Sequence, residues 1–83
     1  MPLRIWIEKT ERASWTNFAE VRQTFGSADQ VGNNRVIFNV GGNKFRLVAA
    51  IGYKTGFVLL KFVGTHKQYD RIDPEVIEVK DWK

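Results

Sequence analysis

The sequence predicts an α+β domain in which two N-terminal helices pack against a small, twisted antiparallel sheet. Apolar residues recur with helical spacing in the first third of the chain, and they alternate with a period of two through residues 35–63. Turn signals separate the alternating runs. At 83 residues the chain has the length of one domain, so we expect residues 1–83 to form a single unit.

The composition is that of a chain that folds alone without disulfides. Hydrophobic residues make up 43% of it, and there is no cysteine. The N-terminus carries charged side chains within its first eight residues, and no apolar stretch is long enough to cross a membrane. We therefore expect no signal peptide, no membrane association and a cytoplasmic location.

The first 26 residues predict two helices. In PLRIWIEKTER, Pro2 suits a first helical turn, although the same stretch also alternates as a strand would. In SWTNFAEVRQTFG, Asn17 and Glu20 have the spacing of a capping box, and an apolar stripe follows them. We expect the next stretch, SADQVGNN, to be a turn-rich connection.

Residues 35–63 predict a three-stranded antiparallel meander. The runs RVIFNV, KFRLVAAIGY and FVLLKFV are separated by the turn sequences GGN and KTG. In the middle strand, Lys44 and Arg46 alternate with apolar residues, so they lie on the face away from the helices, here called the second face. In the last strand, the same alternation places Leu60 and Phe62 opposite Lys61, which then joins the second face.

The last strand leads into the run GTHKQYDR, residues 64–71, which contains the only histidine, His66. A lysine, a tyrosine and an arginine follow the histidine within five residues. Beyond this run, Asp73 suits an N-cap and Pro74 a first helical position, so we expect a short C-terminal helix or tail.

Positive charge is concentrated in the middle of the chain. Residues 35–71 carry seven Lys and Arg side chains against one acid, a net charge of +6, whereas residues 1–34 sum to zero and residues 72–83 to −2. Such a block favours a polyanionic partner, and nucleic acid is the first candidate. The alternative is that the basic side chains only keep a sheet soluble.

The chain lacks the residues that most catalytic chemistries need. With one histidine and no cysteine, a zinc site would require carboxylates from scattered positions, so we expect no metal and no cofactor. Neither a Walker phosphate loop nor a G-x-S-x-G motif is present. Metal-free RNA cleavage remains, because it needs only a base, an acid and cations for the phosphate.

The residues for this chemistry are available, and each of them also has a plainer role. His66 can exchange a proton near neutral pH. Tyr69 can orient a 2′-hydroxyl, transfer a proton or stack on a base. Arg46 and Arg71 suit bidentate phosphate contacts. Equally, the histidine could stabilise a turn, the tyrosine could pack in the core, and the cations could line a solvated sheet face.

Two long motifs, FNVGGNKFRL and FVGTHKQYDRID, resemble the HigB family of bacterial type II toxin–antitoxin systems, within the RelE-like mRNA interferase superfamily. The resemblance extends from about Trp15 to Ile77. It implies a RelE-like fold and a ribosome-dependent endoribonuclease that cuts translated mRNA without metal. It also implies a HigA-like helix-turn-helix antitoxin, encoded beside the toxin, and a toxin–antitoxin hetero-oligomer.

The resemblance and the basic block together define the predicted site. The predicted catalytic residues are His66, Tyr69, Arg46 and Lys61. The predicted RNA contacts are Asn43, Lys44, Lys67, Arg71 and Lys54. Relatives commonly have THAEYD where this chain has THKQYD, a change that makes the predicted site more basic.

The chain also departs from the family pattern, and this departure keeps other functions open. Relatives usually have an additional strand ahead of a stretch like LRIWIEKTERASW, so we expect a sheet that lacks this strand and has an exposed edge. The alternatives to a nuclease are a non-catalytic RNA- or ribosome-binding module, from a degenerate or truncated toxin, and a domain whose basic face only binds an acidic antitoxin segment.

Overall fold

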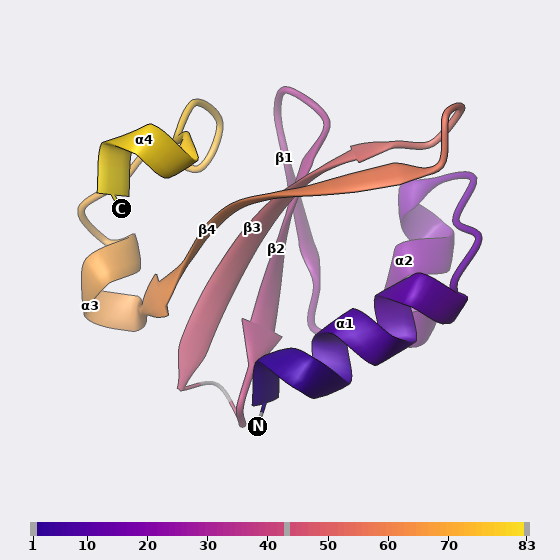
Figure 1. Ribbon diagram of the computed structural model, residues 1–83, viewed down its shortest axis with the longest axis horizontal. Helices are drawn as coiled ribbons and strands as arrows, with labels where there is room; N and C mark the ends of the chain where they lie inside the picture. Colours follow the sequence, from indigo (N-terminus) through magenta and orange to yellow (C-terminus); the bar gives the residue numbers. More distant parts are fainter. Residues whose placement is uncertain (1, 43, 83) are drawn as a thin grey trace.

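The computed structural model describes residues 2–42 and 44–82, and it confirms the predicted α+β architecture. Two helices lie against one face of a twisted antiparallel sheet, and two short helices follow the last strand (Figure 1). In chain order, the elements are α1 (Pro2–Arg12), α2 (Phe18–Thr24), β1 (Asp29–Val31), β2 (Arg35–Val40), β3 (Phe45–Gly52), β4 (Phe57–Thr65), α3 (His66–Tyr69) and α4 (Val79–Trp82).

The sheet has four strands in the order β1-β2-β3-β4, one more than the predicted meander. The stretch expected to be a turn-rich connection contains β1, which pairs antiparallel with β2, with Val31 opposite Arg35. Asn33 and Asn34 form the turn between them, at φ 62° and 57°. Asparagine tolerates this left-handed conformation better than most residues. A strand of three residues is too short to produce an alternation signal, and for that reason the sequence did not predict it.

Helices α1 and α2 cover the first face of the sheet around the buried ring of Phe38. The ring of Trp6 meets Phe38 edge-on at 5.4 Å, and that of Phe25 meets it at 5.1 Å, measured between ring centroids. Trp15 stacks on the same ring at 6.3 Å. Val21 of α2 is fully buried in this cluster. Aromatic pairs of this kind stabilise a small core beyond the area they bury.

The start of α2 confirms Asn17 as the N-cap but alters the predicted capping box. The Glu20 main-chain N–H donates to Asn17 Oδ1 at 3.0 Å. The Glu20 carboxylate, in contrast, accepts hydrogen bonds from the main chain and hydroxyl of Thr16, one residue before the cap. The hydrogen bonds of Asn17 and Thr16 to Glu20 still fix the point where the chain enters α2.

The second face carries a smaller apolar cluster that the C-terminal segment, residues 70–82, covers together with α3. Ile37, Val48 and Phe62 from the sheet meet Ile77 in this cluster. The prediction that Leu60 and Phe62 share a face is wrong. Val48 pairs with Phe62 and the next residue of β3 pairs with Leu60, so Lys61 is left between them in a β-bulge. The bulge shifts the alternation by one residue and turns Phe62 to the second face.

An ion-pair network fastens the C-terminal segment to the sheet. Arg35 is 3% exposed, and its guanidinium donates to the main-chain oxygen of Ile77 and to Glu78 Oε2, the latter at 2.7 Å. Lys61 Nζ lies 2.7 Å from the other carboxylate oxygen of Glu78. One acidic side chain therefore joins β2, β4 and the C-terminal segment.

The C-terminal helix starts later than predicted. Asp73 caps only a single turn, in which its Oδ1 accepts from the Glu75 main-chain N–H at 3.0 Å. Helix α4 begins at Val79 instead, next to the Glu78 main-chain N–H that donates to Asp81 Oδ2. Trp82, on this helix, donates its indole N–H to the main-chain oxygen of Lys61 in β4.

The junction between β4 and α3 fixes the position of His66 as the first residue of α3. Thr65 Oγ1 accepts from the Gln68 main-chain N–H at 3.2 Å, and Gln68 Oε1 accepts from the Thr65 main-chain N–H at 2.9 Å. This is a reciprocal capping box. Gly64 leaves room for it, since a Cβ there would lie 2.6 Å from Gln68 Oε1 and 2.8 Å from the ring of Phe62.

We predict that Gly64→Ala lowers the free energy of unfolding by about 1–3 kcal/mol, because the added methyl group meets a packed ring and the capping amide. Urea unfolding measures this change. Gly26→Ala is the matched control, since a Cβ at Gly26 meets nothing within 4 Å. Equal losses in the two variants would contradict the packing described for Gly64.

We also predict an acid-dependent contribution from Glu78. Hydrogen bonds from Lys61 and then Arg35 hold the pKa of Glu78 below its ordinary value of 4.5. Because this pKa is lower in the folded chain than in the unfolded chain, the carboxylate stabilises the fold above the ordinary pKa, and the contribution is lost as the pH falls through the lowered value.

Urea unfolding of the wild type and Glu78→Gln at about pH 7 and about pH 3 tests this linkage. The wild type is expected to be the more stable of the two at the higher pH, and the difference is expected to shrink at the lower pH. A difference that stays the same at both pH values would rule out the ionised carboxylate as its source.

Candidate nucleic-acid interface

Three of the predicted catalytic residues meet where β4 leads into α3. Arg46, on β3, pairs across the sheet with Gly64, two residues before His66. Its guanidinium carbon lies 4.7 Å from the centroid of the Tyr69 ring. Tyr69 follows His66 by three residues on α3, a spacing that makes the two side chains neighbours on a helix. The guanidinium of Arg46 therefore contacts the Tyr69 ring, and His66 begins the helical turn that carries this ring.

The imidazole of His66 is only partly covered. The residue as a whole has intermediate exposure. Its Nε2 atom is nevertheless buried, and it has no hydrogen-bond partner among residues 2–42 and 44–82. A buried nitrogen without a partner meets a bound group only when the ring turns toward it.

The environment of Tyr69 keeps its phenol protonated. Burial raises the pKa of Tyr69 above its ordinary value of 10.0, and the positive charge of Arg46 acts in the opposite direction. The nearby carboxylates of Asp29 and Asp70 raise it further. At neutral pH the hydroxyl therefore carries its proton and can donate it or form a hydrogen bond.

Asn39 joins the same face and was not predicted from the sequence. It pairs with Arg46 across β2 and β3, and its Nδ2 donates to the main-chain oxygen of Ser27 at 3.4 Å. Asn39 lies within an apolar run, RVIFNV, and for that reason it was assigned to the core strand alone. The turn at Gly41 and Gly42 could have predicted this position of Asn39, because the register of the hairpin sets Asn39 opposite Arg46.

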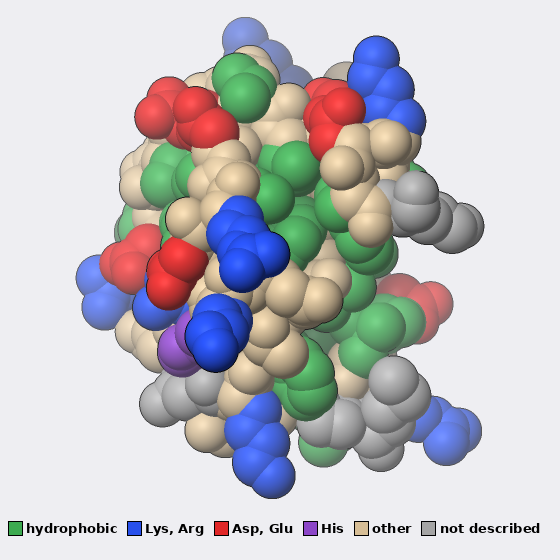
Figure 2. Space-filling model, turned by 90° about the vertical axis from the view of Figure 1, so that its left-hand side faces the viewer, with side chains coloured by type: hydrophobic (Ala, Val, Ile, Leu, Met, Phe, Trp, Pro, Cys, Tyr) green, Lys and Arg blue, Asp and Glu red, His purple; other side chains and the backbone are tan. Residues whose placement is uncertain are grey.

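Predicted RNA contacts surround this point. Lys67 and Arg71, both exposed, line a shallow hollow of about 210 Å³ beside the capping residues of α3. Lys44 is exposed next to the start of β3, the end of that strand that pairs with Thr65. Figure 2 shows the histidine side chain with Lys and Arg side chains around it on this face of the molecule. Asn43 lies outside the described residues.

The structure does not bring Lys61 to the other predicted catalytic residues. It lies five residues before His66, roughly 15 Å along an extended strand. Its side chain is 19% exposed, and its amine pairs with Glu78. No local sequence pattern could predict this pairing, because the two residues are 17 positions apart.

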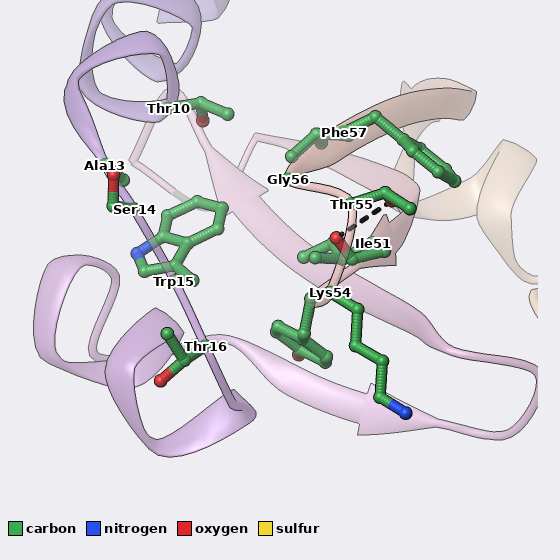
Figure 3. Close-up of a pocket in the computed structure, with 13 residues that line it drawn as sticks. Thr10, Ala13, Ser14, Trp15, Thr16, Ile51, Lys54, Thr55, Gly56 and Phe57 are labelled. Atoms are coloured by element: carbon green, nitrogen blue, oxygen red, sulfur yellow. Dashed lines mark hydrogen bonds between the residues drawn. The ribbon is translucent and has the colours of Figure 1, made fainter.

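Lys54 lies at the opposite end of the sheet. It is in the turn before β4, about 25 Å from His66 when measured along the nine residues of that strand. There it lines a separate hollow of about 250 Å³, between the connection from α1 to α2 and the turn from β3 to β4. Figure 3 shows the Lys54 side chain extending away from Trp15, which forms the opposite wall.

The charge count of the sequence therefore overstates the cationic face. Arg35 is buried, and Glu78 engages both Arg35 and Lys61, while Lys54 is remote from His66. The basic side chains at the His66 end of the sheet are Lys44, Arg46, Lys67 and Arg71.

Two further properties concern the described part of the chain as a whole. Within it, no group of three or more His, Cys, Asp or Glu side chains is arranged to hold a metal ion. Across the same residues, no helix has the length and apolar character needed to cross a membrane.

Comparison with known proteins identifies the family. A search of curated proteins found no match. A protein-family model does match, over residues 1–72; it describes the HigB toxin, a RelE-like toxic component of a toxin–antitoxin system. The matched stretch includes every residue of the predicted site and the whole of the sheet. The two sequence motifs, the α+β fold and this match lead to one conclusion: the chain belongs to the HigB family of RelE-like toxins from toxin–antitoxin systems.

Proposed function

We propose that this toxin is a ribosome-dependent mRNA endonuclease that acts in the cytoplasm without a metal ion. The observation that carries the proposal is the contact of the Arg46 guanidinium with the Tyr69 ring, at 4.7 Å, on the helical turn that begins at His66. This group offers a cation for the phosphate and two side chains that can move protons. A HigA-like helix-turn-helix antitoxin, bound in a hetero-oligomer, would hold the activity in check.

The proposed reaction is attack by a 2′-hydroxyl on the adjacent phosphate. The 2′-oxygen loses its proton and bonds to phosphorus, while the bond from phosphorus to the 5′-oxygen breaks and that oxygen gains a proton. The products are a 2′,3′-cyclic phosphate and a 5′-hydroxyl. We assign His66 to accept the first proton. Tyr69, whose burial raises its pKa, keeps its proton at neutral pH and is assigned to donate the second.

Arg46 is assigned to the phosphate itself. Contact with the Tyr69 ring orients its guanidinium, and the donors on the guanidinium edge suit two phosphate oxygens. Asn43, Lys44, Lys67 and Arg71 are the proposed contacts along the RNA backbone. Lys54 stays a predicted RNA contact, one that only an RNA long enough to span the sheet would reach.

Lys61 stays a predicted catalytic residue on the condition that its ion pair with Glu78 opens. Its amine pairs with Glu78 at 2.7 Å, so it reaches an RNA phosphate only when that ion pair opens. This engagement favours a second candidate function, a non-catalytic RNA- or ribosome-binding module. Such a module would bind RNA through the same cations and leave it uncut.

We predict that His66→Ala, Tyr69→Phe and Arg46→Gln each reduce cleavage of translated mRNA by about 10²–10⁴-fold, because each removes a proton-transfer group or the phosphate cation. Primer extension on an mRNA under translation measures the cut products. Tyr53→Phe and Arg22→Gln are the matched controls, since both residues lie away from α3 and should leave cleavage unchanged.

Two results would contradict the assignment. One is an Arg46→Gln variant that cuts as the wild type does. The other is a wild type that binds the translating ribosome and cuts nothing, which would establish the binding module instead.

We further predict that Lys67→Gln and Arg71→Gln each weaken binding to a single-stranded RNA and lower the slope of log K against log salt by about 0.7, the value for one phosphate contact. Fluorescence anisotropy over a series of salt concentrations gives both quantities. Lys80→Gln, on α4, removes one charge elsewhere and should lower the affinity without a comparable change of slope. Equal slopes for all three variants and the wild type would exclude these two residues as phosphate contacts.

A further inference from the structure

A groove of about 480 Å³ lies between α1 and the hairpin from β2 to β3. Figure 1 shows the N-terminal end of α1 beside the tip of this hairpin. The walls are formed by Ile5, Trp6 and Lys9 from α1, by Phe25 and by residues 39–42. Ile5 is 57% exposed, so its apolar side chain is only half covered by the fold.

The groove contains a buried hydrogen-bond donor with no acceptor. Trp6 is 6% exposed, and its Nε1 atom is buried without a partner among the residues that the structure describes. The other two indoles are satisfied: Trp15 donates to Thr24 Oγ1, and Trp82 donates to a main-chain oxygen of β4. An indole N–H can only donate, and Trp6 is a wall residue of the groove, so an oxygen from a molecule bound there would supply the missing acceptor.

The remaining walls restrict what can enter. Ile5, Phe25 and Val40 present apolar surface. Lys9 adds one cation, with its amine 5.7 Å from the centroid of the Phe25 ring. Gly42 leaves the rim open, because a Cβ there would meet nothing within 4 Å. This combination suits an apolar side chain next to a carbonyl oxygen and a carboxylate, which is the chemistry of a peptide segment and not of an RNA backbone.

We propose that this groove is where the antitoxin docks. An apolar antitoxin side chain occupies the groove, an antitoxin oxygen accepts from Trp6 Nε1, and an acidic antitoxin residue pairs with Lys9. The match to the toxic component of a toxin–antitoxin system supplies the protein partner. The proposal rests on that membership and not on the nuclease mechanism, so either can fail without the other.

Docking at this place also accounts for inhibition. Asn39 lines the groove and pairs with Arg46 across the sheet, so the groove adjoins the strand that carries the proposed phosphate cation. Gly41 and Gly42 of the groove come shortly before the exposed Lys44, which precedes the start of β3 at Phe45. The groove is on the helix side of the sheet, so an antitoxin segment held here would inhibit by its bulk beside the Lys44 end of β3 and not by entering the site.

Indole NMR on the ¹⁵N-labelled toxin provides the direct test, with the cognate antitoxin encoded beside the toxin gene as the probe. On saturation, the Trp6 indole N–H resonance is expected to move downfield and become protected from exchange. The indole resonances of Trp15 and Trp82 serve as internal controls, because both already have acceptors. If the antitoxin binds and the Trp6 resonance stays in place, the proposal is overturned.

Affinity measurements on variants give a second readout. Trp6→Phe, Lys9→Gln and Ile5→Gln are each expected to weaken antitoxin binding about tenfold, the effect of losing one buried hydrogen bond, ion pair or apolar contact. Ile7→Gln and Arg12→Gln are the matched controls on the same helix, both exposed and outside the groove. Equal affinities for all five variants would overturn the proposal.

A titration with a short single-stranded RNA completes the design. The RNA is expected to leave the Trp6 resonance unchanged. If the RNA moves that resonance while the antitoxin does not, the groove is an RNA subsite and the docking assignment fails. The wild-type spectra do not depend on the folding of any variant, and cleavage assays on the same samples judge the nuclease proposal separately.

Discussion

The contact between Arg46 and Tyr69 is the interaction on which the arrangement of this toxin depends. Arg46 belongs to the sheet, whereas Tyr69 belongs to the short helix that follows the last strand. Their contact brings the GTHKQYDR run back across the second face instead of letting it extend into solvent. Because Tyr69 lies one turn after His66, the same contact also holds the helix that carries the imidazole against the sheet. The capping box at Thr65 makes this return possible by starting α3 directly where β4 ends.

The basic residues of the chain divide between structural and functional duties. Arg35 and Lys61 share the carboxylate of Glu78, and this pairing holds the C-terminal segment against the sheet. Pairing with a carboxylate reduces the charge that these residues present to an RNA. The cations at the His66 end are exposed or stacked on a ring instead, so they can meet a phosphate. On this account the face has fewer available cations than the sequence suggests, but they are grouped around one imidazole.

The sequence predicted the parts of this structure that depend on periodic or local patterns. These parts are the N-terminal helices and the strands around the GGN turn. The parts that it did not predict depend on single residues or distant contacts. A three-residue strand has no measurable alternation, and one bulged residue reverses the face of Phe62. The partner of Lys61 lies in another element, so no local rule could identify Glu78.

A double-mutant cycle tests the central claim most directly, by comparing single-turnover cleavage of a translated mRNA for Arg46→Gln, Tyr69→Phe and the double variant. If the guanidinium and the phenol act as one unit, the double variant loses little more than the worse of the two single variants. If the two losses multiply, Arg46 and Tyr69 act independently, and the contact between them is not the basis of the site.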